Sequence, residues 1–163
     1  MSNNLKFFID GAWVDPVVPT TLDVINPATE EAYTQISVGS KADVDKAVAA
    51  AKKAFATFSK TSVAERLALL KKILEVYNAR FEDIAVAVSN EMGAPLSFAR
   101  DAQAWAGRAH MESTIEALEN YKFSEKRGTT TVVKEPIGVC ALITPWNWPL
   151  NQIVCKVAPA IST

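Results

Sequence analysis

A run of five positions that are all apolar is the strongest constraint on how this chain folds. The run covers residues 139–143 and reads Val-Cys-Ala-Leu-Ile. A strand without a polar face is typical of the interior of a parallel sheet, where helices cover both faces. The turn Pro-Trp-Asn-Trp-Pro follows at 145–149, and residues 150–161 have a helical pattern. The sequence therefore predicts a strand, a tight turn and a helix, which is the first half of a βαβ unit.

The predicted strand lacks neighbours elsewhere in the sequence. A parallel strand reaches its partner through a crossover of a dozen or more residues, and the sequence ends at Thr163. No other segment outside the regions of helical spacing has the same apolar character at every position. We therefore expect an incomplete α/β fold, in which this chain is the N-terminal piece of a larger structure.

Composition excludes several classes of function. The chain has 163 residues, and its 17 Lys and Arg against 18 Asp and Glu give a formal net charge of -1. Without a basic excess, no nucleic acid is expected as a partner. Two cysteines and one histidine exclude a zinc ribbon and a disulfide scaffold, so no metal site is predicted. No apolar run approaches the roughly 20 residues of a membrane span and the N-terminus lacks a signal-peptide pattern, so we expect a cytoplasmic protein without membrane contact.

The remaining sequence predicts short strands followed by a layer of helices. Asp10-Gly11 between two apolar runs predicts a β-hairpin, and further strands are expected over 21–25 and 33–38. From 40 to 121 apolar residues recur at helical spacing, with Ser40 and Ser62 as N-caps. A helix break is expected near 78–81, a helix end at Gly93 and a helix start at Pro95. Residues 122–128 are expected to be a polar turn, and the β-branched residues 129–134 a strand.

The turn at 145–149 is the one candidate site for chemistry. It follows the carboxyl end of the predicted strand, where open α/β sheets bind ligands. Two prolines stiffen it, and two indoles flank the primary amide of Asn147. A rigidly held amide can stabilise a developing oxyanion. The alternative is a turn asparagine whose amide satisfies the local backbone, and spacing alone favours that alternative.

Three linked motifs around this turn resemble those of the NAD(P)-dependent aldehyde dehydrogenase superfamily. They are Glu-Pro-Ile-Gly-Val at 135–139, Thr-Pro-Trp-Asn-Trp-Pro at 144–149 and Lys-Val-Ala-Pro-Ala at 156–160. Earlier segments at 8–13, 24–29 and 91–96 also resemble motifs of that superfamily. The resemblance covers essentially the whole chain. It implies the N-terminal part of the aldehyde dehydrogenase fold: a β-hairpin, a helical layer and the start of a Rossmann-like parallel sheet.

The resemblance implies three parts of the chain. Residues 1–122 would be the N-terminal part of the cofactor-binding domain, 123–137 an oligomerisation strand segment, and 138–163 the first strand, turn and helix of the sheet. The catalytic domain, with its nucleophilic cysteine and general-base glutamate, is expected to be absent. Cys140 and Cys155 are interpreted as buried structural residues. The fragment by itself is therefore predicted to be inactive.

The resemblance also assigns roles to residues of the turn. Asn147 is expected to donate its amide to the oxyanion that forms when a cysteine thiolate attacks the aldehyde. The residues expected to line the site for NAD or NADP are Ile143, Thr144, Pro145 and Trp146. Trp148 is expected beside the substrate tunnel, at a position where the family usually has Phe or Tyr.

Two functions remain open at this point. The first is the N-terminal portion of an enzyme that oxidises an aldehyde to a carboxylic acid with NAD(P) and assembles into a homo-oligomer. The second is a stand-alone, non-catalytic helical module for assembly or regulation, in which strand 129–134 recruits a partner. The only histidine, His110, is interpreted as a surface or helix-interface residue in either case, and Trp105 as a packed residue.

Overall fold

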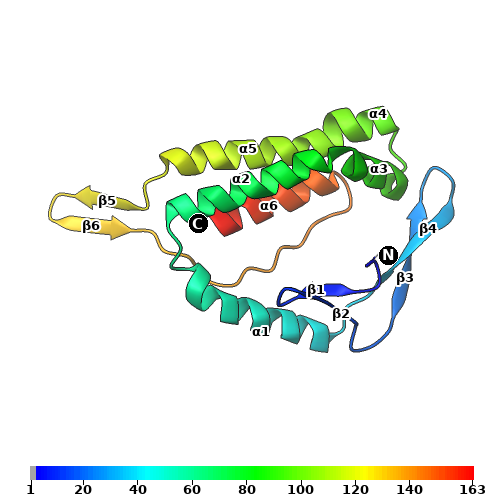
Figure 1. The fold of residues 1–163 in the computed structure, drawn as a ribbon, viewed down its shortest axis with the longest axis horizontal. Helices are drawn as coiled ribbons and strands as arrows, with labels where there is room; N and C mark the ends of the chain where they lie inside the picture. Colours follow the sequence, from blue (N-terminus) through cyan, green and yellow to red (C-terminus); the bar gives the residue numbers. More distant parts are fainter. Residues whose placement is uncertain (1–2) are drawn as a thin grey trace.

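The computed structural model describes residues 3–163, so the first two residues of the expected segment 1–122 lie outside it. A layer of helices carries the core, and three antiparallel two-stranded ribbons lie around it (Figure 1). The elements in chain order are β1 (Phe7–Ile9), β2 (Ala12–Val14), β3 (Thr21–Asn26), β4 (Glu31–Ser37), α1 (Lys41–Phe58), α2 (Val63–Ala79), α3 (Phe81–Met92), α4 (Leu96–Phe98), the π-helix η1 (Ala99–Ala104), α5 (Trp105–Asn120), β5 (Ser124–Arg127), β6 (Thr130–Val133) and α6 (Pro149–Ser162). Among the described residues, no helix combines the length and the hydropathy needed to cross a membrane.

The N-terminal ribbons confirm the predicted hairpin and the two strands after it. Asp10 and Gly11 between β1 and β2 have φ angles of 51° and 78°. Positive φ at both positions is the turn geometry that matches the twist of paired strands. β3 and β4 pair antiparallel with an irregularity between Val24 and Ile25, and their ends differ from the predicted ones by one or two residues.

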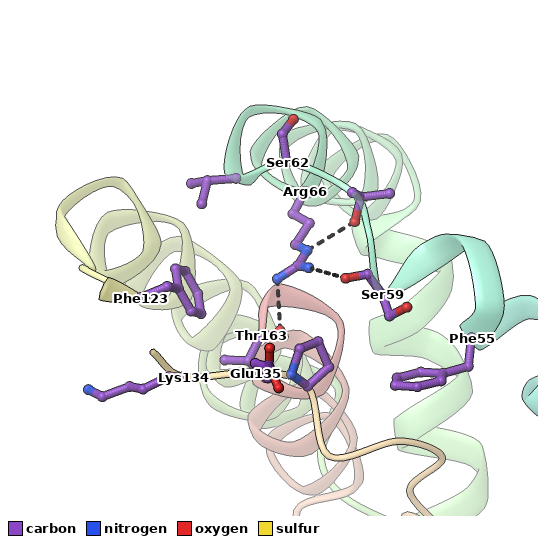
Figure 2. Close-up of a pocket in the computed structure, with 11 residues that line it drawn as sticks. Phe55, Ser59, Ser62, Arg66, Phe123, Lys134, Glu135 and Thr163 are labelled. Carbon is purple, nitrogen blue, oxygen red and sulfur yellow. Dashed lines mark hydrogen bonds between the residues drawn. The ribbon is translucent and has the colours of Figure 1, made fainter. Parts of the chain in front are cut away.

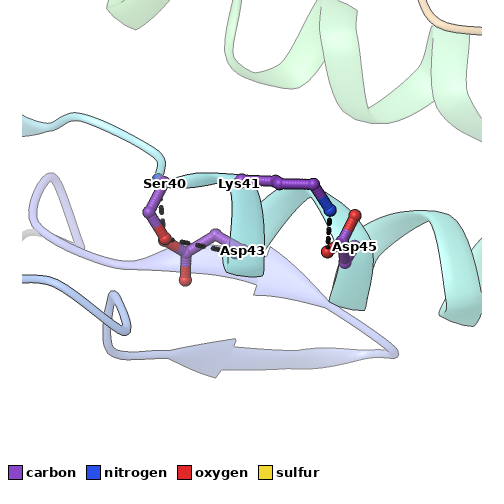
Figure 3. A network of polar contacts seen from close by, with 4 residues as sticks. All are labelled: Ser40, Lys41, Asp43 and Asp45. Carbon is purple, nitrogen blue, oxygen red and sulfur yellow. Dashed lines mark hydrogen bonds and ion pairs between the residues drawn. The ribbon is translucent and has the colours of Figure 1, made fainter.

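A capping box fixes the start of α1, as Figure 3 shows. The Ser40 amide donates to Asp43 Oδ2 at 2.9 Å, and the Asp43 amide donates to Ser40 Oγ at 3.4 Å. Asp43 is 4% exposed and also accepts from the Val17 amide at 2.9 Å. These hydrogen bonds, led by that of the Ser40 hydroxyl, lower the pKa of the Asp43 carboxyl. One carboxylate therefore caps the helix and ties down the preceding loop, whereas the exposed Lys41–Asp45 ion pair beside it adds little.

Helices α2, α5 and α6 pack against one another and form the core. Its buried cluster consists of Leu70, Met111, Ile115, Leu118, Val154 and Ala158. The predicted break is confirmed, because α2 ends at Ala79 and α3 begins at Phe81. Gly93 ends α3 in the left-handed conformation with φ of 67°, as expected.

A π-helix interrupts the helix that the sequence predicts after Pro95. Residues 99–104 form η1 between α4 and α5, and it packs against α3 and α6. The Tyr77 hydroxyl donates to the Ala104 carbonyl at 2.6 Å, and burial raises the pKa of Tyr77 to about 12. Trp105, predicted to be packed, is 55% exposed. The prediction for Trp105 assumed 3.6 residues per turn, and it is wrong because a π-helix has more residues per turn and so rotates the following residues away from the expected buried face.

The predicted polar turn at 122–128 is wrong, because residues 124–127 form strand β5. β5 pairs with β6 in the register Ser124↔Val133 to Arg127↔Thr130. All eight residues of this ribbon are exposed. A strand that is exposed on both faces has no apolar alternation to reveal it.

The predicted buried strand at 139–143 is also wrong in this structure. Residues 135–145 form an extended segment without strand pairing, which runs between α1 and the helical layer (Figure 1). Val139 and Leu142 are each 41% exposed and Ile143 is 84% exposed. Cys140 is exposed and Cys155 half-buried, so their predicted burial is wrong as well. A strand needs a neighbour for its backbone hydrogen bonds, and residues 3–163 provide none for this segment. The start of a parallel sheet is therefore not formed among them, whereas the helix predicted after the turn is confirmed as α6.

Gly107 lets α5 approach both α2 and α6 closely. A methyl group added there would lie 2.5 Å from Tyr77 Oη and 3.0 Å from Leu150 Cβ. We expect Gly107→Ala to lower the free energy of unfolding by about 1–3 kcal/mol, the usual cost of overpacking a core. Urea unfolding followed by circular dichroism measures the change.

Gly39→Ala is the matched control for this measurement. A methyl group added at Gly39 would meet Phe7 Cζ at 3.7 Å, an ordinary contact distance. Equal stability of the two variants would contradict the packing role of Gly107.

Candidate active-site turn

The turn before α6 is held in an unusual backbone conformation. Trp148 has φ of 56° and ψ of 54°, in the left-handed region that bulky residues rarely occupy. This conformation costs roughly 1–2 kcal/mol. Pro149 follows as the first residue of α6, where its fixed φ suits the start of a helix. The chain therefore changes direction sharply just after Asn147.

Asn147 presents a free amide at this bend. Its side chain is exposed and takes part in none of the side-chain hydrogen bonds found among residues 3–163. The alternative of an amide occupied by local backbone is thus not what the structure shows. α6 has no side-chain cap at its start, so an oxygen bound here would also face the positive end of the helix dipole.

The two indoles flanking Asn147 have different surroundings. Trp146 is 85% exposed. Trp148 is 38% exposed and meets Phe98 of α4 edge to face, with 5.7 Å between ring centroids and 74° between ring planes. Phe98 lies in the region 40–121 that the sequence predicts to be helical, and no local sequence pattern links it to a residue as distant as Trp148.

The residues predicted to line the dinucleotide site form one exposed stretch that leads into the turn. Ile143 is 84% exposed, and Thr144 and Pro145 are exposed as well. The structure thus brings the predicted cofactor residues and Asn147 together on one accessible segment. Within residues 3–163 no group of three His, Cys, Asp or Glu side chains could hold a metal ion.

Comparison with known proteins identifies the family of this chain. The profile of the aldehyde dehydrogenase family matches residues 13–163. The chain belongs to the aldehyde dehydrogenase family. It is 48% identical over 163 residues to a 3-succinoylsemialdehyde-pyridine dehydrogenase of a Pseudomonas species, an alignment that covers 99% of this chain and 34% of that protein.

Solved aldehyde dehydrogenases have the same fold over this region. The enzyme from Bartonella henselae matches 99% of the chain with a TM-score of 0.95 and 48% identity. A variant of aldehyde dehydrogenase C from Pseudomonas syringae, solved with NAD+ and octanal, matches 98% with a TM-score of 0.96 and 49% identity. The chain covers 35% and 33% of those two structures. It therefore spans about a third of the length of its relatives and has a partial aldehyde dehydrogenase fold, as the motifs implied.

A cavity of about 540 Å³ lies at the other end of α6, and Arg66 is one of the residues that line it (Figure 2). Arg66 is 6% exposed. Its guanidinium donates to the Thr163 carbonyl at 2.7 Å, to Thr61 Oγ1 at 3.0 Å and, at 3.4 Å each, to the carbonyls of Ser59 and Ser162. One side chain thus binds the loop after α1 and the carbonyl end of α6.

The location of Arg66 suits a positive charge. A hydrogen bond from a charged donor to a carbonyl oxygen is stronger than one between neutral groups, and Arg66 donates to two such oxygens at the end of α6, those of Ser162 and Thr163. Its guanidinium also lies 5.9 Å from the ring centroid of Phe123, at the base of the β5–β6 ribbon. The sequence offered no signal for this role, because an arginine in the first turn of α2 looks like a solvated residue.

We expect Arg66→Met to lower the free energy of unfolding by about 3 kcal/mol, because the charge-assisted hydrogen bonds of a buried guanidinium are lost and the buried Ser162 carbonyl loses its donor. Arg108→Met is the control, since Arg108 forms only an exposed ion pair with Glu112, worth less than about 1 kcal/mol. Thermal and urea unfolding of both variants measure the difference. An Arg66→Met variant as stable as Arg108→Met would show that the hydrogen bonds of Arg66 are unimportant.

Proposed function

We propose that this chain supplies the oxyanion-binding amide and part of the dinucleotide site of an NAD(P)-dependent aldehyde dehydrogenase. The observation that carries the proposal is the free amide of Asn147, exposed at the uncapped start of α6 in a member of this family. Solved relatives from Mycobacterium tuberculosis and Pseudomonas syringae contain NAD+, which supports a nicotinamide cofactor for the complete enzyme.

In the proposed reaction the complete enzyme oxidises an aldehyde to a carboxylic acid. A cysteine thiolate from the remainder of the enzyme forms a C–S bond to the aldehyde carbon, and the carbonyl oxygen becomes anionic. Asn147 donates its amide N–H to that oxygen, and the charge is stabilised because the donor is already oriented. The bound nicotinamide supplies the hydride acceptor for this chemistry. The resulting thioester is hydrolysed by water that a glutamate activates.

The neighbours of Asn147 divide the remaining roles. Ile143, Thr144, Pro145 and Trp146 line the dinucleotide site, which is supported by their exposure on one stretch beside the amide. Trp148 forms a wall of the substrate tunnel, which is supported by an indole that is partly exposed and held against Phe98. The residues thus separate a cofactor side and a substrate side around one hydrogen-bond donor.

A stand-alone helical module has less support. Ile137 and Ile143 are 93% and 84% exposed. Such an apolar segment left in water is a feature of a surface that another part of the protein covers. The two free cysteines are compatible with the reducing cytoplasm, where we place the enzyme.

We expect Asn147→Ala to lower kcat by about 10² to 10³-fold in a full-length dehydrogenase that carries these residues, the usual loss for one oxyanion donor. Steady-state NAD(P)H production measures kcat, and cofactor binding to each variant is measured in parallel. The control is Asn120→Ala, since the Asn120 amide only donates to the Glu116 carbonyl at the surface end of α5. Unchanged turnover in Asn147→Ala would remove Asn147 from the proposed role.

The exposed β5–β6 ribbon is the proposed contact between subunits of a homo-oligomer. It projects away from the helical layer (Figure 1), and its valines Val132 and Val133 are 36% and 59% exposed. Its outer edges carry unpaired backbone groups, which favour pairing with another strand. Arg66, close to Phe123 at the base of the ribbon, links this segment to the core.

We expect Val133→Asp to dissociate the full-length oligomer, because an unpaired charge in a strand interface loses its hydration. Sedimentation velocity measures the assembly state. Val18→Asp places the same charge at a residue that is 51% exposed in the loop before β3 and is expected to leave the assembly intact. An oligomer that survives Val133→Asp would exclude the ribbon as the contact.

A further inference from the structure

We propose that Phe98 is a positioning residue, which holds the turn that carries the Asn147 amide. The proposal rests on the proposed role of Asn147 and adds a residue from a different part of the chain. Its basis is the combination of a left-handed Trp148 with an edge-to-face contact between its indole and the Phe98 ring.

The backbone of Trp148 needs support from its surroundings. Among the described residues, the non-glycine positions with positive φ are Asp10, Glu30 and Trp148. Asp10 and Glu30 lie in the turns of the β1–β2 and β3–β4 hairpins, where strand pairing fixes the backbone. Trp148 has no such ladder around it. A strained residue of this kind persists only where neighbouring structure holds it, and such residues cluster at active sites.

The contact with Phe98 provides this support. No side chain caps α6, and the indole of Trp148 meets the Phe98 ring at a centroid distance of 5.7 Å in an edge-to-face arrangement. This arrangement is the favoured one for two aromatic rings, and its angular preference restrains the indole. The backbone of the turn is restrained with it, because the indole is attached at the strained residue.

The backbone around Phe98 is held in place by buried neighbours and hydrogen bonds. It ends α4, and the next residue, Ala99, is fully buried and donates its amide to the Pro95 carbonyl at 2.9 Å. The π-helix that follows packs against α3, and its last residue Ala104 accepts the hydrogen bond of the Tyr77 hydroxyl at 2.6 Å. The ring of Phe98 is therefore presented from a segment anchored at both ends.

The amide of Asn147 depends on this arrangement because it precedes Trp148 by one peptide. If Trp148 leaves the left-handed region, the Asn147 side chain turns with the backbone. A misplacement of about 1 Å can lower the rate by about 10²-fold even when the change lies away from the reacting atoms. Phe98 thus acts on the oxyanion donor through Trp148, without touching the substrate.

The test is a double-mutant cycle in a full-length dehydrogenase that carries these residues. We expect Phe98→Ala to lower kcat by about 10-fold for short and long aldehydes alike, with the KM for the dinucleotide unchanged. Asn147→Ala is expected to lower kcat by about 10² to 10³-fold, and the double variant is expected to be no slower than Asn147→Ala. Non-additivity of this kind shows that the two residues act as one unit.

Two further variants separate positioning from general damage. Phe98→Tyr keeps the ring and is expected to have a kcat within about 3-fold of the original enzyme. Phe98→Leu keeps the apolar bulk without the ring, and its kcat is expected to be lower than that of Phe98→Tyr. If Phe98→Ala does not fold, Phe98→Leu takes its place in the cycle. Phe8→Ala is the matched control, because Phe8 and Trp13 form the same kind of edge-to-face pair at 5.3 Å in the β1–β2 hairpin. It is expected to leave kcat unchanged.

Three results would overturn the proposal. The first is a kcat of Phe98→Ala equal to that of Phe8→Ala. The second is a further loss when Phe98→Ala is added to Asn147→Ala, and the third is an effect confined to the KM of long aldehydes, which would make Phe98 a tunnel residue only. A normal kcat in Asn147→Ala contradicts the proposed function itself, whereas a low kcat there with a normal Phe98→Ala contradicts only this inference.

Discussion

The packing of α6 against α2 and α5 is the interaction on which the remaining structure depends. Val154 and Ala158 of α6 are buried against Leu70 and Met111. The absent side chain of Gly107 allows Leu150, at the start of α6, to lie against α5. Because a helix is rigid over this length, fixing its buried face also fixes both of its ends. The turn with Asn147 lies at one end and the hydrogen bonds of Arg66 at the other.

Each end of α6 is completed by a side chain from a distant part of the sequence. Phe98 reaches the turn at the N-terminal end, and Arg66 binds the carbonyl groups at the C-terminal end. The two contacts differ in kind, since the first is an oriented aromatic pair and the second a set of charge-assisted hydrogen bonds. The Phe98 contact lies where the chain enters the helix, and the Arg66 hydrogen bonds link its other end to the loop after α1. The placement of the Asn147 side chain is thus a tertiary property, although the residues around it form a short motif.

The features that could be predicted from the sequence are those with a local physical cause. The Asp10-Gly11 hairpin, the Ser40 and Ser62 caps and the Gly93 helix end each depend on a few adjacent residues. The prediction of a strand at 139–143 was wrong, because its hydrogen bonds require neighbouring strands that residues 3–163 do not contain. β5 was not predicted, because an exposed ribbon has no apolar face. The Phe98–Trp148 contact was not predicted either, because it depends on how a π-helix and a loop place the two rings. The candidate site was found through its motif, whereas the contacts that hold it became visible only in the fold.

The extended segment at 135–145 has a consequence for the isolated chain. No backbone–backbone hydrogen bond joins it to the rest of residues 3–163, and apolar side chains such as Ile137 and Ile143 are almost fully exposed. A segment of this composition without a partner strand is a template for cross-β association between identical molecules. The same residues that suit the interior of a sheet therefore make the isolated chain prone to aggregation. Its solubility depends on how soon another strand covers them.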